Sequence, residues 1–210
     1  EVTGSGKITN MLPEGVETVG NAAFYQSDLA DNLVIPSTVT TIQSSAFNAN
    51  NVDVHYDKVT IKPDLTYESA ANQLVHQMLW KVDFDELVVE SNMLVGLDRY
   101  ADSAFYQEFY NLKMDKVTIT NLPKITRGAF DKCHNLVEVD LSKDANLDEI
   151  KTEAFLDDEK LHIIKFSPAI KNKTVTLGQR ILVNTAFETI GDSTKEFDLT
   201  AAKFVTPQSV

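Results

Sequence analysis

The sequence is poor in cysteine, in long apolar runs and in basic side chains. Its one cysteine, Cys133, excludes an internal disulfide, so packing alone must stabilise the fold. No apolar run approaches the roughly 18 residues of a membrane-spanning helix, so we expect no direct membrane insertion. The 19 basic and 31 acidic residues give a net charge of −12, which disfavours a nucleic-acid partner and docking on anionic lipid, because both need a cationic surface.

What remains is an ordinary globular composition. The 210 residues are 43% hydrophobic and 24% charged, which is enough for one sizeable core. We therefore expect a single domain over residues 1–210. The chain begins at Glu1 rather than at methionine, which indicates a mature or trimmed protein whose export signal, if it has one, is not in the given sequence.

An internal repeat organises the hydrophobic residues. The dipeptide Ala-Phe recurs six times, and an apolar or aromatic residue stands four positions before each alanine, Leu182 being the last of these. Successive alanines are 23, 58, 25, 25 and 32 residues apart, so the longest interval predicts a degenerate copy, which we place at 67–72. The six alanines are Ala23, Ala46, Ala104, Ala129, Ala154 and Ala186.

Short runs of alternating apolar residues accompany the Ala-Phe pairs. The segments 136–141 and 161–166 both read L-x-x-[VI]-x-[LF], and such alternation predicts short strands with one buried face. One strand and one turn cannot bury an apolar face alone, so the units must stack at about 4.8 Å, the spacing of hydrogen-bonded strands. We expect the Ala-Phe turns to be helical or 3₁₀ and their phenylalanines to fill the core.

These motifs resemble the BspA-type leucine-rich repeats of bacterial cell-surface proteins, whose units end in Ala-Phe. Asn32 to Phe47 (NLVIPSTVTTIQSSAF) matches best, and the resemblance extends from about Ile8 to Phe187 and toward Leu199. It implies a leucine-rich repeat solenoid of about seven repeats, α/β or mostly β, in which short parallel strands and helical or 3₁₀ turns form a right-handed curved stack. It also implies that Cys133 occupies a buried family position.

Two segments depart from the repeat pattern. Residues 62–82 resemble a degenerate repeat with a longer amphipathic helix, in which Trp80 closes the core. An insertion at Lys171–Thr176 stretches the last period to 32 residues. Residues 1–10 and 201–210 are polar or small enough to be caps or tails, which a solenoid needs at its ends.

Residues that could carry catalysis or bind a metal are scattered along the chain. The acidic runs 83–86 and 157–159 lack the spacing of a calcium loop, so we interpret them as solvated turn charge. No nucleophile elbow or phosphate loop occurs. We therefore predict a protein that is not an enzyme and has no cofactor and no metal. The histidines, which we interpret as surface or turn residues without zinc-ligand spacing, are His55, His76, His134 and His162.

Alternation along the strands predicts which side chains face outward. If Val139 and Leu141 point inward, Glu138 and Asp140 line the outer strand face, and the same rule holds for the other strands. Three aliphatic members of this face would form an apolar stripe flanked by charge, as at a protein contact, or they merely reflect strand propensity. The stripe is Val34, Val88 and Ile163, and the other outward candidates for ligand contact are Thr60, Thr118, Lys165 and Asp198.

Functions of three classes fit such a repeat. The resemblance implies export to the bacterial cell surface and adhesion, so the first hypothesis is a non-enzymatic surface or secreted module whose strand face recognises a host, matrix or microbial protein. The second is a structural spacer of a larger surface protein. The third is glycan binding, which needs exposed aromatic rings. Tyr25, Tyr106 and Tyr110 follow Ala-Phe motifs and either pack at the core edge or contact a partner.

Overall fold

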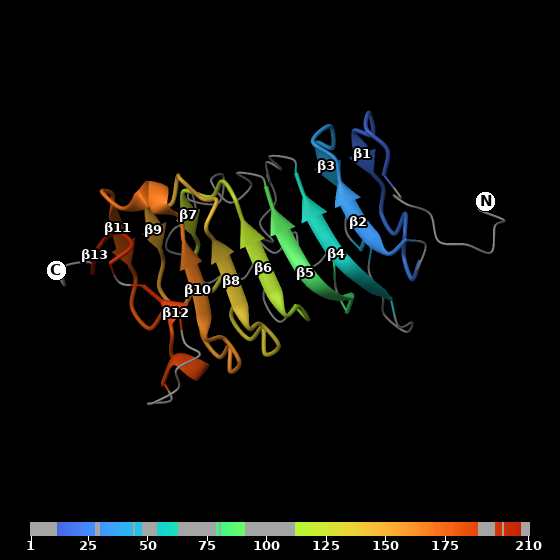
Figure 1. Ribbon diagram of the computed structural model, residues 1–210. Coiled ribbons are helices and arrows are strands. Elements are labelled where there is room, and N and C mark those ends of the chain that lie inside the picture. The colour runs from blue at the N-terminus through green and yellow to red at the C-terminus, as the bar shows by residue number, and fades with distance from the viewer. Residues whose placement is uncertain are drawn as a thin grey trace.

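Parallel strands form three sheets along one stack of coils (Figure 1). The computed structural model describes residues 12–27, 30–43, 45–47, 54–62, 79, 81–90, 112–188, 196–198 and 200–206, and all structural statements concern these residues. Successive coils add successive strands to the sheets, so the chain is a leucine-rich repeat solenoid, as its motifs predict. No helix within the described ranges has the length and apolar character needed to cross a bilayer.

The largest sheet has seven strands in the order β12-β10-β8-β6-β5-β4-β2. Its strands lie side by side across Figure 1, and every pair is parallel. The order follows the sequence, with the strands of the other sheets passed over, because each coil returns to the same side of the stack. The strands are β2 (Asn32–Ile35), β4 (His55–Ile61), β5 (Asp83–Val89), β6 (Lys116–Ile119), β8 (Glu138–Leu141), β10 (Ile163–Phe166) and β12 (Glu196–Phe197).

Two smaller sheets contain the apolar residues that precede the Ala-Phe turns. Ile125 pairs with Ile150, and Val19 pairs with Ile42. One sheet consists of β1 (Thr18–Val19) and β3 (Thr41–Ile42), and the other of β7 (Lys124–Ile125), β9 (Glu149–Ile150), β11 (Thr174–Leu177) and β13 (Lys203–Val205). The described 3₁₀ helices are η2 (Pro168–Ile170) and η3 (Ala186–Glu188).

The Ala-Phe turns in register with the stack are successive tight turns rather than helices. The Ala129 N–H donates to Thr126 O at 3.2 Å, and the Cys133 N–H donates to Phe130 O at 3.1 Å. Gly128 lies in the first of these turns and Lys132 in the second, and their φ angles are 58° and 62°. A left-handed residue every four positions stops a right-handed helix from forming, so the helical prediction for these turns is wrong.

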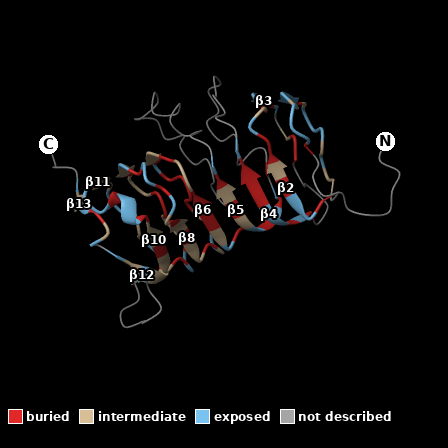
Figure 2. Cartoon of the chain, turned by 45° about the horizontal axis from the view of Figure 1, so that its top comes forward, coloured by how far each residue is buried: buried red, intermediate tan, exposed pale blue. Residues whose placement is uncertain are grey.

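Buried residues, red in Figure 2, recur in successive coils along the stack. Their apolar side chains form one core cluster. Val139 and Leu141 are buried while Glu138 and Asp140 are half-buried, which confirms the predicted alternation of β8. The rings of the Ala-Phe motifs also stack between coils: the centroids of Phe130 and Phe155 lie 5.6 Å apart. Cys133 is fully buried, as the family resemblance implies.

The last Ala-Phe pair is out of register with the others. The Phe130 N–H donates to Ala154 O, whereas the Phe155 N–H donates to Ile181 O. Ile181 and Leu182 therefore occupy the Ala-Phe positions of the last coil, and Leu177, which pairs with Ile150, takes the place predicted for Leu182. The pair Ala186-Phe187 instead begins η3. The prediction that this pair marks the sixth equivalent turn is wrong, because backbone pairing fixes the register independently of the motif.

The insertion in the last coil is also shorter than the motif spacing suggests. Ile125, Ile150 and Leu177 are successive partners in one sheet, so the last period is 27 residues rather than 32. The preceding period, from Ile125 to Ile150, is 25 residues, so the last one is longer by two. Phe166 pairs with Leu141, 25 residues earlier, so the two additional residues lie after Phe166, between β10 and β11. The 3₁₀ helix η2 lies in that connection and takes up the added length.

Several sequence predictions lie outside the described residues. Of the C-terminal segment expected to be a cap or tail, residues 201–206 are described and contain β13, which pairs with β11. The predictions outside the described ranges concern the degenerate copy at 67–72, the helix over most of 62–82, Trp80, Ala104-Phe105, His76, Tyr106, Tyr110 and the N-terminal segment 1–10.

Candidate functional site

Strand register aligns the outward side chains of the seven-stranded sheet into two rows. The rows are two residues apart along each strand, which is about 6 to 7 Å. The C-terminal row comprises Val34, Thr60, Val88, Thr118, Asp140 and Lys165, each paired with the next. The N-terminal row comprises Asn32, Lys58, Glu86, Lys116, Glu138, Ile163 and Glu196.

The structure brings most of the predicted contact residues together. Six of the eight outward residues chosen on β2 to β10 form the C-terminal row, and the other two, Glu138 and Ile163, stand in the N-terminal row. Asp198 is exposed just beyond β12. Hydrogen bonds from the hydroxyl and the N–H of Thr200 lower the pKa of its carboxyl.

The predicted apolar stripe is not continuous. Val34 and Val88 are half-buried in the C-terminal row, but Thr60 on β4 stands between them. Ile163 belongs to the other row, on β10, three strands away from Val88 on β5. The row instead has an uncharged part of four side chains, which we call the uncharged strip: Val34, Thr60, Val88 and Thr118.

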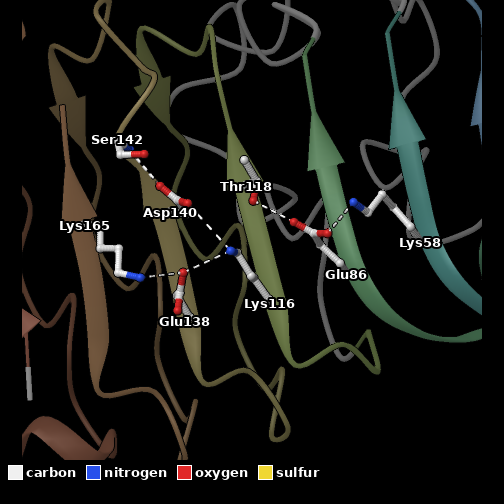
Figure 3. A network of polar contacts seen from close by, with 8 residues as sticks. All are labelled: Lys58, Glu86, Lys116, Thr118, Glu138, Asp140, Ser142 and Lys165. Atoms are coloured by element: carbon white, nitrogen blue, oxygen red, sulfur yellow. Dashed lines mark hydrogen bonds and ion pairs between the residues drawn. The ribbon is translucent and has the colours of Figure 1, made fainter. Parts of the chain in front are cut away.

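Alternating charges in the N-terminal row hold one another in place (Figure 3). Lys58 Nζ lies 2.7 Å from Glu86 Oε2. Lys116 and Lys165 approach Glu138 Oε1 from the strands on either side, each at 3.1 Å. Cross-strand pairs of opposite charge stabilise neighbouring strands by a few tenths to about 1 kcal/mol each.

The pKa values of this network reflect its pairing. Burial alone would raise the pKa of Glu86, but hydrogen bonds from Lys58 and Thr118, together with the charges of Lys58 and Lys116, lower it below its usual value. Burial would lower the pKa of Lys116, yet its hydrogen bond to Glu138 and the charges of Glu138, Asp140 and Glu86 raise it. Both groups therefore stay ionised at neutral pH, and the network is intact there.

Asp140 links the two rows. Lys116 Nζ lies 3.7 Å from its Oδ2, and the Ser142 N–H donates to its Oδ1 at 2.9 Å. Burial would raise the pKa of Asp140, but hydrogen bonds from Ser142 and the charges of Lys116 and Lys165 lower it. The network thus contains three lysines and three carboxylates, so it is neutral in itself although the chain carries a charge of −12.

Sequence reasoning missed three members of the network, Lys58, Glu86 and Lys116. Each directly precedes an inward residue of its strand: Val59, Leu87 and Val117 are all fully buried. In the pattern L-x-x-[VI]-x-[LF], the residue before the second apolar position is therefore a second outward site. Reading both outward sites of every repeat, instead of one, would have found the charge alternation.

Two acidic runs differ from their interpretation as solvated turns. Residues 83–86 lie in strand β5, where Asp83 and Asp85 are exposed and Glu86 is ion-paired. Asp158 is fully buried, and its Oδ1 accepts the Cys133 N–H at 2.8 Å. Burial raises the pKa of Asp158 well above its usual value, and the charges of nearby acids add to this. The carboxyl is buried because it satisfies a backbone donor of the preceding coil.

One exposed cluster could contribute metal ligands. His55, Asp57 and Asp85 on β4 and β5 place one ligand atom each within 4.8 Å of one another. His55 Nε2 lies 3.7 Å from Asp85 Oδ1, and all three residues are exposed. Exposed carboxylates remain well hydrated without an ion, so we assign no metal to this cluster.

Comparisons with known proteins found one family and one solved structure to which the chain is similar. A family described as "BspA type Leucine rich repeat region" matches residues 4–69 and 101–196 in six copies. Among solved structures, the chain is similar to a leucine-rich repeat protein from Bacteroides ovatus, with 18% sequence identity and a TM-score of 0.41. That alignment covers 86% of this chain and 50% of the other, so the chain spans half the length of that protein. No curated protein matches.

Proposed function

Because the chain belongs to the BspA-type leucine-rich repeat family, we propose that it is a non-enzymatic module that binds another protein through the outer face of its seven-stranded sheet. Leucine-rich repeat domains generally mediate protein–protein interactions, and stacked repeats present extended binding surfaces. Proteins of this family are typically associated with the bacterial surface. We include surface or secreted location, adhesion, and a single domain over residues 1–210 in the proposal.

The observation that carries this proposal is the uncharged strip beside a charged row. Val34 and Val88 are half-buried, and Thr60 and Thr118 are only 8% and 9% exposed, so no charged side chain lies within the strip. The side chains of the neighbouring Lys58 and Lys116 are 45% and 37% exposed. Protein interfaces combine an apolar centre depleted of charge with a polar rim, and the two rows supply both in one plane.

The charged row suits recognition better than catalysis. Glu86 and Glu138 are already paired with lysines, so neither is poised to accept a substrate proton. Fixed charges of alternating sign on a rigid sheet select partners of complementary pattern and repel others. Glycan binding has less support as the alternative, because neither row contains an aromatic side chain, although Tyr25 on a turn is 39% exposed.

The test measures binding of the full chain to immobilised collagen, fibronectin and laminin by surface plasmon resonance. Val88→Lys puts a charge at the centre of the uncharged strip and should weaken any observed binding at least tenfold. Ala145→Lys introduces the same charge at an exposed position away from the sheet and is the matched control. Ile163→Lys, in the N-terminal row and three strands away from Val88, should have a smaller effect.

The outcomes separate the candidate functions. Loss of binding in Val88→Lys but not in Ala145→Lys supports recognition through the strand face. Equal affinity of both variants would place the binding site elsewhere on the molecule. Absence of binding to all three matrix proteins would argue against a matrix partner and would favour the structural spacer.

A further inference from the structure

A polar groove lies on the four-stranded sheet, apart from the outer face of the seven-stranded sheet. Its volume is about 490 Å³, and it lies at β9 and along the segments that follow β7, β9 and β11. None of its lining residues belongs to the seven-stranded sheet. Three of them are cationic, namely Arg127, Lys151 and Arg180, in a chain whose net charge is −12.

Glu153 orients the two arginines from inside the groove. Its side chain is only 18% exposed, and its two carboxylate oxygens each accept from a different guanidinium group. Arg127 donates from Nε and Nη2 to Oε2 at 3.3 and 3.1 Å, and Arg180 donates from Nη1 to Oε1 at 2.7 Å. The side chains of Arg127 and Arg180 remain 48% and 57% exposed. The bonds to Glu153 therefore hold both guanidinium groups in place, while some of their N–H donors remain exposed to solvent.

Gly178 permits this arrangement. A Cβ on Gly178 would overlap the backbone nitrogen of Thr152 and the carbonyl carbon of Lys151, so only glycine lets the last coil come this close. The close approach brings Arg180 onto the coil that contains Glu153. The Gln179 N–H donates to Thr152 Oγ1 at 3.3 Å, which ties the same two coils together at the floor of the groove.

We propose that this groove binds an acidic peptide segment of a partner protein, through carboxylate groups held by Arg127 and Arg180. A guanidinium fork fits a carboxylate with two parallel hydrogen bonds, and charge-assisted bonds of this kind are the strongest that side chains make. The second carboxylate of the lining, Glu149, lies 3.9 Å from Lys124 Nζ. The acidic groups of the groove thus face cations of the protein, and the exposed arginine donors face the ligand.

A peptide fits the lining better than an acidic polysaccharide does. Thr152 and Gln179 offer a hydroxyl and a primary amide, groups that hydrogen-bond peptide backbone as both donor and acceptor. The lining contains no aromatic ring that could lie against a sugar face. The groove also crosses successive coils, so an extended segment can place carboxylates on Arg127 and Arg180 in turn.

The experiment measures fluorescence anisotropy of fluorescein-labelled hexaglutamate with the full chain at 50 and 150 mM NaCl. We expect saturable binding that weakens with salt, and no binding of labelled hexaglutamine. Arg127→Gln and Arg180→Gln should each weaken binding about tenfold, and Arg180→Lys should weaken it less because the charge remains. Lys203→Gln removes an exposed charge from β13, outside the groove, and is the matched control.

Three outcomes would overturn the inference. Hexaglutamate that fails to bind would refute the acidic-peptide site. Equal losses of affinity in Lys203→Gln and Arg180→Gln would leave only general electrostatic attraction. Polygalacturonate that binds more tightly than hexaglutamate and depends on the same arginines would replace the peptide by a polysaccharide. Thermal unfolding of both arginine variants verifies that they are folded. Val88→Lys should retain peptide binding, so this result is independent of the strand-face proposal.

Discussion

The coil at 153–166 and the coil at 178–188 share one backbone path but differ in how they fill the interior. Phe155 is fully buried and stacks on Phe130. Leu182, its equivalent in the last coil, is only partly buried. This end of the stack also contains a cluster of rings that meet at tilted or edge-on angles. These rings are Phe166, Phe187, Phe197 and Phe204.

The difference shows that backbone pairing, and not the Ala-Phe motif, defines a coil. Gly128, Glu153 and Arg180 hold the same left-handed position in three successive coils, with φ of 58°, 61° and 56°. The last coil keeps this turn after losing both the alanine and the phenylalanine. The motif therefore determines how well a coil packs, whereas hydrogen bonds to the neighbouring coil determine where it lies.

The largest expected effect comes from removing the buried ring. Phe155→Ala should lower the free energy of unfolding by about 3 to 5 kcal/mol, because it leaves a cavity in the stacked column. Leu182→Ala, at the equivalent position, should lower it by only about 1 to 2 kcal/mol, since that side chain is already partly in contact with water. Urea unfolding followed by circular dichroism measures both. Equal losses would mean that the two coils are packed equally well.

Gly178→Ala should push the last coil away from the coil at 153–166, which we call the middle coil, and so lower the free energy of unfolding. The new Cβ would meet backbone atoms of Thr152 and Lys151, which cannot move aside as a side chain can, and overpacking of this kind costs about 1 to 3 kcal/mol. Gly20→Ala is the control, because a Cβ there meets only Gln43 Oε1 at 4.0 Å. Urea midpoints compare the two variants. A Gly178→Ala protein as stable as Gly20→Ala would contradict the close approach.

The buried carboxyl of the middle coil should give the protein a pH dependence that the last coil lacks, since Thr185 stands where Asp158 stands one coil earlier. The raised pKa of Asp158 means that the folded state holds its proton more tightly, so stability falls as pH rises from about 4 through that raised pKa. Asp158→Asn should be more stable than the natural protein at pH 7 and similar at pH 3.5.

The control for this prediction removes the acceptor itself. Asp158→Ala leaves the Cys133 N–H buried without its side-chain acceptor, which should cost about 1 to 3 kcal/mol at every pH. Unfolding free energies between pH 3.5 and 8 test both variants. An asparagine variant whose pH profile matches that of the natural protein would show that Asp158 does not titrate in this range.

The smallest effect should come from the left-handed position that the two coils share with the earlier ones. Gly128→Ala places a Cβ at φ of 58° and should lower the free energy of unfolding by about 1 kcal/mol. Ser45→Gly relieves the same strain, at φ of 58° in an earlier turn, and should leave stability unchanged or slightly higher. Differential scanning calorimetry can resolve the two shifts. A stabilising Gly128→Ala would refute a shared backbone conformation.

Much of the fold follows from the sequence because inward residues repeat with a fixed spacing. The alternation around Val139 and Leu141, and the burial of Phe130 and Cys133, depend only on local pattern. The register of the last coil does not, because hydrogen bonds between distant backbone groups decide it. Asp158 was also misjudged, since its burial depends on a donor, the Cys133 N–H, 25 residues away in the sequence.

The candidate site could be predicted in part. Alternation identifies which side chains point outward, and six of these align in the C-terminal row. Which of them are neighbours depends on strand order and register, so the separation of Val34, Val88 and Ile163 could not be foreseen. The pairing of Glu138 with Lys116 and Lys165 likewise joins three coils and has no local signature.

The parallel register also bears on how such a surface can evolve. Each coil contributes one residue to each row, so duplication of one unit of about 25 residues would add one rung, about 4.8 Å long, and leave the existing rungs in place. A point mutation changes the character of one rung, whereas a duplication changes the length of the whole face. Reach and specificity can therefore vary separately in descendants of this gene.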